Sequence, residues 1–160
     1  MESKKASEQK ILVADDEAPI RELLEQVLAA DGYTVIVATD GKDALQKTLA
    51  HKPDLILLDV RMPKLDGITL CKALRIYKET KNTPIIILTA FNTRDYLEQA
   101  IAAGADDFLP KPFELGELKI RVRSMLKLKH VSDEVERLQA YIIAIREARG
   151  QMTDKPDKLG

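Results

Sequence analysis

Short apolar segments and helical patterns alternate along this chain five times. The apolar segments are residues 11–14, 34–38, 55–58, 84–88 and 107–109. Ile, Val and Leu dominate the first four without polar alternation, which is typical of strands buried on both faces. The fifth segment is short and gives a weaker signal. Strict alternation of strand and helix predicts a parallel sheet with helices on both faces.

The segments between the predicted strands carry helix start and stop signals. In the first, Pro19 suits an opening turn and Gly32 suits the left-handed position after the last turn. Its apolar residues have the spacing of one buried helix face: Ile20, Leu23, Leu24, Val27 and Leu28. Further helices are expected at 41–50, 68–77, 93–103 and from Glu114 onward. Five such units predict a flavodoxin-like (βα)5 sheet of order 2-1-3-4-5, with ligands bound beyond the carboxyl ends of the strands.

Acidic residues follow the first and third predicted strands. Asp15 and Asp16 come directly after the first strand, and Asp59 ends the third. If these strands are neighbours, the three carboxylates converge on one pocket, where like charges raise each other's pKa values. A divalent cation with hard oxygen ligands relieves that repulsion. The sequence therefore predicts a Mg2+ site formed by Asp15, Asp16 and Asp59.

Two more polar residues follow the fourth and fifth predicted strands, namely Thr89 and Lys111. A carboxylate in such a pocket can attack phosphorus, so Asp59 is predicted to be a phosphoryl acceptor. Lys111 would pair with one phosphoryl oxygen and Thr89 would donate a hydrogen bond to another, and phosphoryl transfer requires little more than this positioning. Each residue alone has an ordinary interpretation as a cap, turn, strand-end or surface residue. Their joint occurrence at adjacent strand ends favours a functional site.

Charge and composition limit the other function classes. The net charge is -1, so no overall field attracts nucleic acid or an anionic membrane, and direct DNA binding is not expected. No apolar run approaches the length that spans a bilayer. The single cysteine, Cys71, cannot form an intramolecular disulfide and is expected to be a buried residue. A reducing cytoplasm is the expected compartment.

Four segments together resemble the receiver domain of two-component response regulators. They are Ile-Leu-Val-Ala-Asp-Asp-Glu at 11–17, Pro-Asp-Leu-Ile-Leu-Leu-Asp-Val-Arg-Met-Pro-Lys-Leu-Asp-Gly at 53–67, Pro-Ile-Ile-Ile-Leu-Thr-Ala at 84–90 and Gly-Ala-Asp-Asp-Phe-Leu-Pro-Lys-Pro-Phe at 104–113. The resemblance covers about residues 10–129, and the set in this order and spacing is highly specific. It implies that Asp59 takes a phosphoryl group from the phosphohistidine of a sensor histidine kinase or phosphotransfer protein. It also implies that Asp16 and Asp59 ligate Mg2+ directly, Asp15 through water, and Arg61 through its main-chain carbonyl.

The same resemblance assigns roles in signal transmission. Lys111 and Thr89 would contact the phosphoryl group, and Phe108 would change rotamer when Thr89 moves inward. Many relatives have Tyr at that position. Phe108 has no hydroxyl, so it cannot report the switch through a hydrogen bond. The resemblance further implies a cis peptide bond between Lys111 and Pro112.

The resemblance implies a regulatory phosphoacceptor rather than an enzyme. An aspartate-dependent phosphohydrolase also uses a strand-end Asp and Mg2+, but it needs an acid two residues later to protonate the leaving group. Arg61 occupies that position here. Arg61 and Phe91 flank the expected site and would screen water from the acyl phosphate, so only slow autodephosphorylation is expected.

The sequence beyond the fifth predicted strand indicates a long helix. Apolar residues at Leu128, Val131, Val135, Leu138, Ile142 and Ile145 have heptad spacing. No Pro or Gly occurs from Glu117 to Arg149, so the helix is expected to continue without interruption and to form a short coiled coil or a docking helix. The alternatives are a helix that folds back on its own domain and a frayed tail.

The expected organisation has a disordered leader at 1–9, a receiver domain at 10–129, a helical extension at 130–149 and a disordered tail at 150–160. No winged-helix, helix-turn-helix or nucleotide-cyclase segment fits after Gly150. If this is the whole protein, phosphorylation is expected to switch protein–protein contacts with a partner that the sequence does not identify. A homodimer through the fourth and fifth helices or through the extension is one such contact. The alternative is a constitutively dimeric scaffold that phosphorylation only modulates.

Overall fold

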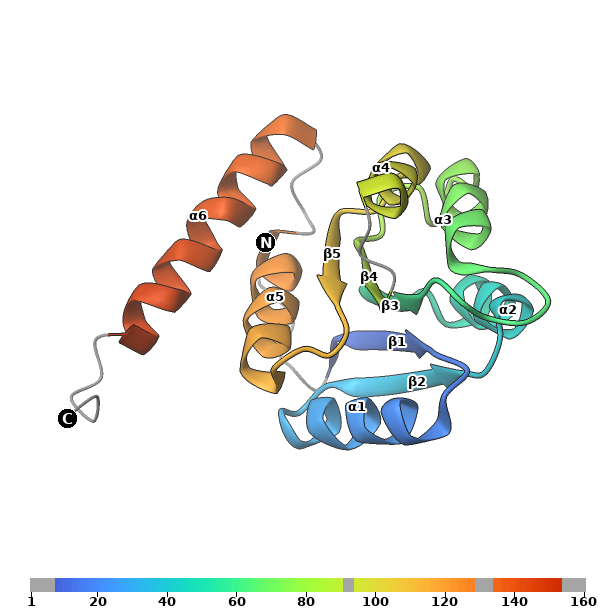
Figure 1. Cartoon of the computed structure of the whole chain (residues 1–160), viewed down its shortest axis with the longest axis horizontal. Helices are drawn as coiled ribbons and strands as arrows, with labels where there is room; N and C mark the ends of the chain where they lie inside the picture. The colour runs from blue at the N-terminus through green and yellow to red at the C-terminus, as the bar shows by residue number, and fades with distance from the viewer. Residues whose placement is uncertain (1–7, 91–93, 129–133, 154–160) are drawn as a thin grey trace. The chain divides into compact units, whose positions relative to one another are not determined.

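The computed structural model describes residues 8–90, 94–128 and 134–153 and confirms the alternating strand and helix pattern (Figure 1). The chain divides into two compact units, Met1–Pro112 and Phe113–Gly160. The first unit contains one parallel sheet in the predicted order β2-β1-β3-β4-β5. Its strands are β1 (Lys10–Ala14), β2 (Thr34–Ala38), β3 (Leu55–Asp59), β4 (Ile85–Thr89) and β5 (Asp107–Pro110).

The helices of the first unit are α1 (Ala18–Ala30), α2 (Gly41–His51), α3 (Gly67–Ile76) and α4 (Arg94–Ala103). Two of them start at an aspartate cap. The Asp40 side chain accepts a hydrogen bond from Asp43 N at 2.8 Å, and the Asp66 side chain accepts one from Thr69 N at 2.9 Å. Such caps satisfy backbone donors that lack partners inside the helix and fix where each helix begins.

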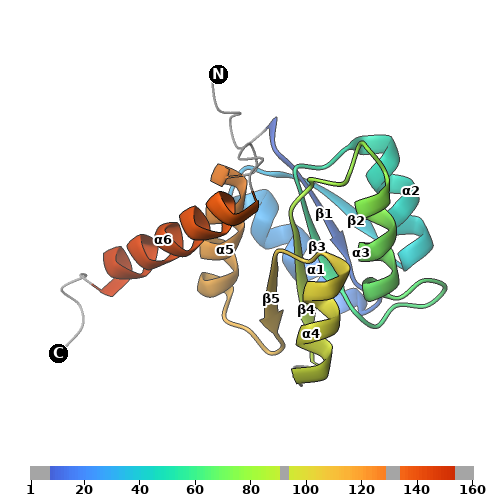
Figure 2. The ribbon, with the colours of Figure 1, turned by 90° about the horizontal axis from the view of Figure 1, so that it is seen from above.

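Alternate residues of the strands form two hydrophobic layers. Leu12, Ile56 and Ile87 belong to a buried cluster shared with α2, α3 and α4 on one face of the sheet. The intervening strand residues point to the other face, where α1 lies with Leu24 and Leu28 fully buried (Figure 2). Each such side chain contributes about 1.5–3 kcal/mol through burial, so this core fixes the sheet.

One arginine holds the irregular segment between α3 and β4 in place. The Arg75 guanidinium donates hydrogen bonds to the main-chain oxygens of Thr80, Lys81 and Thr83 at 3.2, 3.1 and 2.6 Å. It also donates to Gly104 O and to the Asp106 carboxylate, each at 2.9 Å. Arg75 therefore ties the loop before β4 to the loop before β5.

The strand register brings the carboxyl ends of four strands to one edge. β1 lies beside β3, Asp59 of β3 pairs with Leu88 of β4, and Thr89 pairs with Pro110 of β5. The residues that follow β1, β3, β4 and β5 are therefore neighbours at this edge.

The second unit consists of α5 (Leu115–Leu128) and α6 (Glu134–Thr153), which pack against each other. Arg149, near the end of α6, hydrogen bonds to Glu117, near the start of α5. The chain therefore reverses direction between the two helices. The expectation of one uninterrupted helix from Glu117 to Arg149 is wrong, because α6 gains a packing surface on α5 by folding back.

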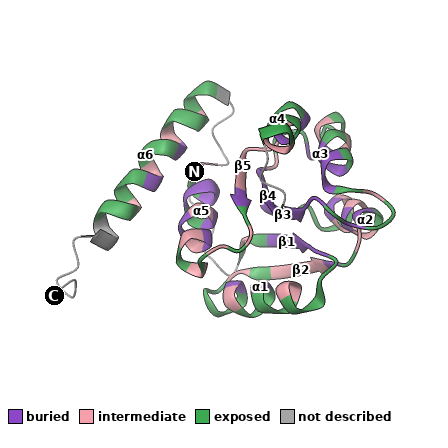
Figure 3. Ribbon diagram, viewed as in Figure 1, coloured by how far each residue is buried: buried purple, intermediate pink, exposed green. Residues whose placement is uncertain are grey.

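The face of α6 that is buried differs from the predicted heptad seam. Of the described seam residues of α6, only Ile145 is buried, whereas Val135, Leu138 and Ile142 are 65%, 52% and 43% exposed (Figure 3). Tyr141, one turn before Ile145, is the other buried side chain in the described part of this helix. The heptad spacing correctly predicts an apolar stripe, but most of that stripe is not the face that packs.

The ends of the described chain also differ from the expected boundaries. Gln9, in the predicted leader, accepts a hydrogen bond from Thr34 N at 3.0 Å through its main-chain oxygen. α6 continues to Thr153, beyond the expected start of the tail at 150. The rest of the predicted leader before residue 8, the tail after 153, and Phe91 and Val131 lie outside the described residues. None of the described helices is long and apolar enough to cross a membrane.

Candidate functional site

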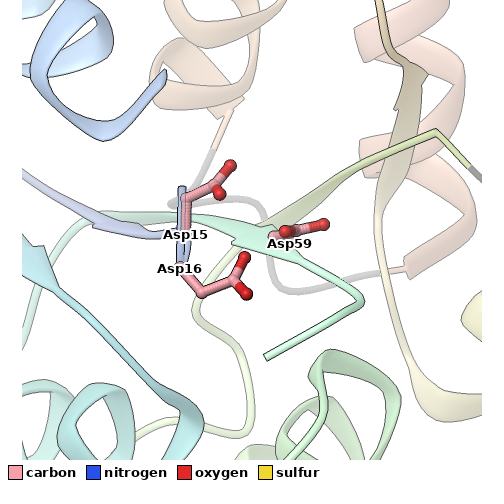
Figure 4. Close-up of side chains that lie close together, drawn as sticks. All are labelled: Asp15, Asp16 and Asp59. Atoms are coloured by element: carbon pink, nitrogen blue, oxygen red, sulfur yellow. The ribbon is translucent and has the colours of Figure 1, made fainter. Parts of the chain in front are cut away.

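Three carboxylates project from the ends of β1 and β3 into one region (Figure 4). Asp15, Asp16 and Asp59 each offer an oxygen within 4.8 Å of the others. Asp15 and Asp59 are buried, whereas Asp16 is exposed. The convergence follows from the placement of β1 beside β3 in the sheet, since both strands end at the same edge.

Lys111 is the cation of this cluster. Its Nζ lies 2.8 Å from Asp15 Oδ2, 3.6 Å from Asp59 Oδ2 and 3.9 Å from Glu17 Oε2. Burial alone would lower the pKa of Lys111, but the hydrogen bond that Lys111 donates to Asp15 and the negative charges of Asp15, Asp59 and Glu17 outweigh it, so the pKa is raised. Lys111 therefore stays protonated.

Asp59 titrates far from its ordinary range. Burial raises its pKa to about 7, and the negative charges of Asp15 and, to a smaller extent, Asp16 act in the same direction. The Lys111 charge and a hydrogen bond from the Arg61 backbone N–H oppose this rise without cancelling it. The positive charge of one lysine is thus insufficient to neutralise three carboxylates, and the site favours an additional cation.

Two predicted switch residues lie at the same sheet edge or near it. Thr89 is fully buried at the end of β4, and its main-chain oxygen accepts a hydrogen bond from Lys111 N at 2.7 Å. Phe108 is half-buried on β5 and packs against the α2–α4 side of the core. The Lys111–Pro112 peptide bond is cis, as the sequence resemblance implies.

The side chain of Arg61 is exposed and lines an open groove of about 710 Å³ together with Asp16, Lys72 and Tyr96. Its backbone turns toward the acidic cluster, because the Arg61 N–H hydrogen bonds to the Asp59 carboxylate. The structure thus brings Asp15, Asp16, Asp59 and Lys111 together and places the Arg61 main chain beside them.

The acidic cluster fits a Mg2+ ion. Mg2+ takes oxygen ligands at about 2.0–2.1 Å, so two of its ligands lie at most about 4.2 Å apart, and the carboxylate oxygens here lie within 4.8 Å of one another. Asp16 is exposed and can adjust its rotamer, and the groove beside it leaves room for the waters that Mg2+ retains. The donor set is entirely oxygen, which suits this hard cation rather than a softer metal.

Residues 11–123 match the family model described as the response regulator receiver domain. The chain belongs to the response regulator receiver family. The matched range includes every site residue described above, and a receiver domain is a regulatory domain rather than a conventional enzyme.

Curated relatives and solved structures agree with this assignment. The receiver domain is 44% identical over 128 residues to "Response regulator MprA" of Mycobacterium ulcerans, an alignment that covers 78% of this chain and 53% of the relative. The chain thus spans about half the length of the curated relatives it matches. It is also similar to the Francisella response regulator 1452 receiver domain (TM-score 0.69, 41% identity, covering 74% of this chain and 97% of that one). A putative response regulator from Chloroflexus aurantiacus gives a TM-score of 0.71 with 41% identity, covering 74% of this chain and 98% of that one.

Two residues contribute to the geometry of the site without having been predicted to do so. Arg21 donates a hydrogen bond from Nη1 to the main-chain oxygen of Asp15 at 2.8 Å. The Glu17 backbone N–H donates to Asp15 Oδ1 at 2.9 Å, so Asp15 is fixed at both its main chain and its side chain. The Glu17 contact could have been anticipated, because an Asp side chain in a turn often accepts a hydrogen bond from the backbone N–H two residues on. The Arg21 contact had no sequence signal beyond a position one turn after Glu17.

Proposed function

We propose that this receiver domain accepts a phosphoryl group on Asp59, in the cytoplasm, from the phosphohistidine of a sensor histidine kinase or a phosphotransfer protein. The observation that carries the proposal is the convergence of Asp15, Asp16 and Asp59 with Lys111 at one sheet edge. A buried carboxylate held between two acids and a lysine has little purpose in stability, because unneutralised buried charge is costly.

The chemistry requires one bond to form and one to break. An Asp59 oxygen attacks phosphorus, the P–N bond of the donor breaks, and the imidazole nitrogen keeps the electron pair. A bound Mg2+ would offset the negative charge of the phosphoryl oxygens. Lys111 is placed to pair with a phosphoryl oxygen by leaving Asp15, and Thr89 supplies a hydroxyl at the end of the adjacent strand.

Signal transmission in this proposal begins at the strand ends. The phosphoryl oxygens draw Thr89 and Lys111 toward them, and Phe108, on the strand beside Thr89, occupies the space that Thr89 leaves. The altered surface around α4 and β5 then changes affinity for a protein partner. Slow autodephosphorylation, with Arg61 restricting water, completes the cycle.

Intact-protein mass spectrometry after incubation with acetyl phosphate and Mg2+ tests the acceptor role. We expect a single phosphoryl mass increment on the wild-type chain, no increment on Asp59→Asn, and none on the wild type in EDTA. Equal labelling of wild type and Asp59→Asn would disprove the assignment. So would failure of the folded wild type to label with both acetyl phosphate and a cognate kinase.

A constitutive dimer that phosphorylation only modulates is the second candidate. The exposed apolar residues Val135, Leu138 and Ile142 on α6 favour it, because apolar side chains at helical spacing are a common dimer surface. Light scattering with and without beryllofluoride distinguishes the two. The scaffold is supported if the wild type is a dimer both with and without beryllofluoride. The Leu138→Ser, Ile142→Ser double variant should then lose the dimer, and Ile143→Ser should keep it. Ile143 is a matched control, because it is 54% exposed on another side of the helix.

A further inference from the structure

The loop between β3 and α3 is attached to the rest of the first unit at both of its ends. At its base, Gly67 N donates to Val60 O at 2.8 Å. At its tip, Lys64 has a left-handed φ of 71°, and Leu65 N donates to Pro63 O at 2.8 Å, which closes a tight turn. This loop carries Arg61, whose backbone N–H hydrogen bonds to the Asp59 carboxylate.

The tip of the loop rests on the first residues of α2. Gly41 N donates to Pro63 O at 3.4 Å, and Lys64 Nζ lies 3.5 Å from Asp40 Oδ2. The approach is close because Gly41 has no side chain. A Cβ at Gly41 would lie 1.7 Å from Leu65 O and 2.6 Å from Leu65 C, both backbone atoms.

No side chain can therefore be added at Gly41 without moving the loop. Real Cβ contacts are essentially never shorter than 3.0 Å, so the backbone at Leu65 must retreat by about 1 Å or more. The hydrogen bond from Gly67 N to Val60 O holds the base of the loop in place. The displacement is therefore taken up between this base and the tip, in the segment that contains Arg61. Asp15 follows β1 and Asp59 ends β3, whereas the three atoms nearest to a Cβ at Gly41 all belong to Leu65.

We propose that Gly41 is a positioning residue for the phosphoacceptor site. By allowing the β3–α3 loop to pack against the start of α2, it sets the Arg61 main chain against Asp59. This inference rests on the proposed function and on the role that the sequence resemblance implies for the Arg61 main-chain carbonyl, that of a Mg2+ ligand. It predicts that a methyl group on α2 impairs a site to which α2 contributes no side chain.

The test is Gly41→Ala in the full chain, with Mg2+ affinity measured by isothermal titration calorimetry. We expect affinity on the order of tenfold weaker, the scale seen when supporting contacts of a metal ligand are lost. We expect phosphorylation by acetyl phosphate to slow by roughly ten- to a hundredfold at saturating Mg2+. Wild-type Mg2+ affinity in folded Gly41→Ala would overturn the inference. A wild type that binds Mg2+ but takes no phosphoryl group would instead refute the proposed function.

Gly104→Ala is the matched control for general strain. Gly104 has a φ of +101°, and a Cβ there would lie 2.7 Å from Arg75 Cγ, away from the β3–α3 loop. This variant should lose stability in urea but keep wild-type Mg2+ affinity. Equal loss of affinity in both variants would assign the effect to strain and overturn the positioning role.

A measurement on the wild type covers the case in which Gly41→Ala does not fold. In a Mg2+ titration followed by 15N NMR, the Gly41 and Leu65 amide signals should shift and saturate with the same dissociation constant as the Asp59 amide. The Gly104 amide should stay in place. Unmoved Gly41 and Leu65 signals at saturating Mg2+ would refute the coupling.

Discussion

Replacing Asp59 with Asn removes one negative charge from the acidic cluster while keeping the size of the side chain. The pKa of Asp59 rises from 3.8 to about 7 in the folded chain, chiefly through burial and then through Asp15. One pKa unit corresponds to about 1.36 kcal/mol, so ionised Asp59 opposes folding of the metal-free protein by about 4 kcal/mol. The Asp59→Asn variant should therefore be more stable than the wild type wherever Asp59 is ionised.

The sign of the pH dependence follows from which state ionises first. The unfolded chain loses the Asp59 proton near pH 4, whereas the folded chain holds it until about pH 7. Metal-free wild type should therefore lose stability as the pH rises through this window, and the Asn variant should not. The two stabilities should coincide near pH 4 and differ by about 4 kcal/mol above pH 7.

Urea unfolding in EDTA at a series of pH values measures this difference. Adding Mg2+ at the high-pH end should stabilise the wild type more than the variant, because only the wild type has three carboxylates to neutralise. A difference between the two proteins that stays constant from about pH 4 to about pH 8 would refute the reasoning, because it would mean that Asp59 titrates normally in the folded chain.

Two other substitutions test separate parts of the molecule. Lys111→Met leaves Asp15, which is 1% exposed, without its cation. The variant should be less stable than the wild type by roughly 3–5 kcal/mol in the absence of metal, and it should bind Mg2+ more tightly. Unchanged urea unfolding in EDTA would contradict this prediction. Arg75→Ala removes the bonds to Gly104, Asp106 and three loop carbonyls and should cost about 2–4 kcal/mol in urea unfolding. The rate at which acetyl phosphate phosphorylates the Arg75→Ala variant should stay at the wild-type level. A large loss of this rate would mean that Arg75 also helps to position the phosphoacceptor site.

The sequence predicts the sheet and the convergence of carboxylates because both depend on local patterns. Uninterrupted Ile and Leu in 55–58 and 85–88 are typical of buried strands, and the strand order was expected because five strand–helix units fit a flavodoxin-like sheet. Asp15, Asp16 and Asp59 then meet because each follows a strand that ends at one edge of the sheet. Residue type and position along the chain were sufficient for these features.

Features that depend on how helices and loops pack against one another were not predicted from the sequence. The spacing of Val135, Leu138 and Ile142 indicates an apolar stripe, but it does not show that α6 packs on α5 and that Tyr141 and Ile145 are its buried side chains. The reversal itself had a weak signal, since Ser132 and Asp133 before α6 are favoured helix-capping residues. Nothing in the sequence near Gly41 indicates that a loop more than twenty residues later rests on it.

The way Arg75 holds the loop before β4 has a consequence for sequence variation. The guanidinium binds main-chain oxygens at Thr80, Lys81 and Thr83, and every residue has such an oxygen. The side chain at an exposed position such as Lys81 can therefore be exchanged without loosening the start of β4. Thr80 is the exception, because its buried hydroxyl donates to Leu74 O at 2.5 Å. Homologues should accordingly vary in the composition of this loop but keep its length, and a single-residue insertion should be less well tolerated than several substitutions.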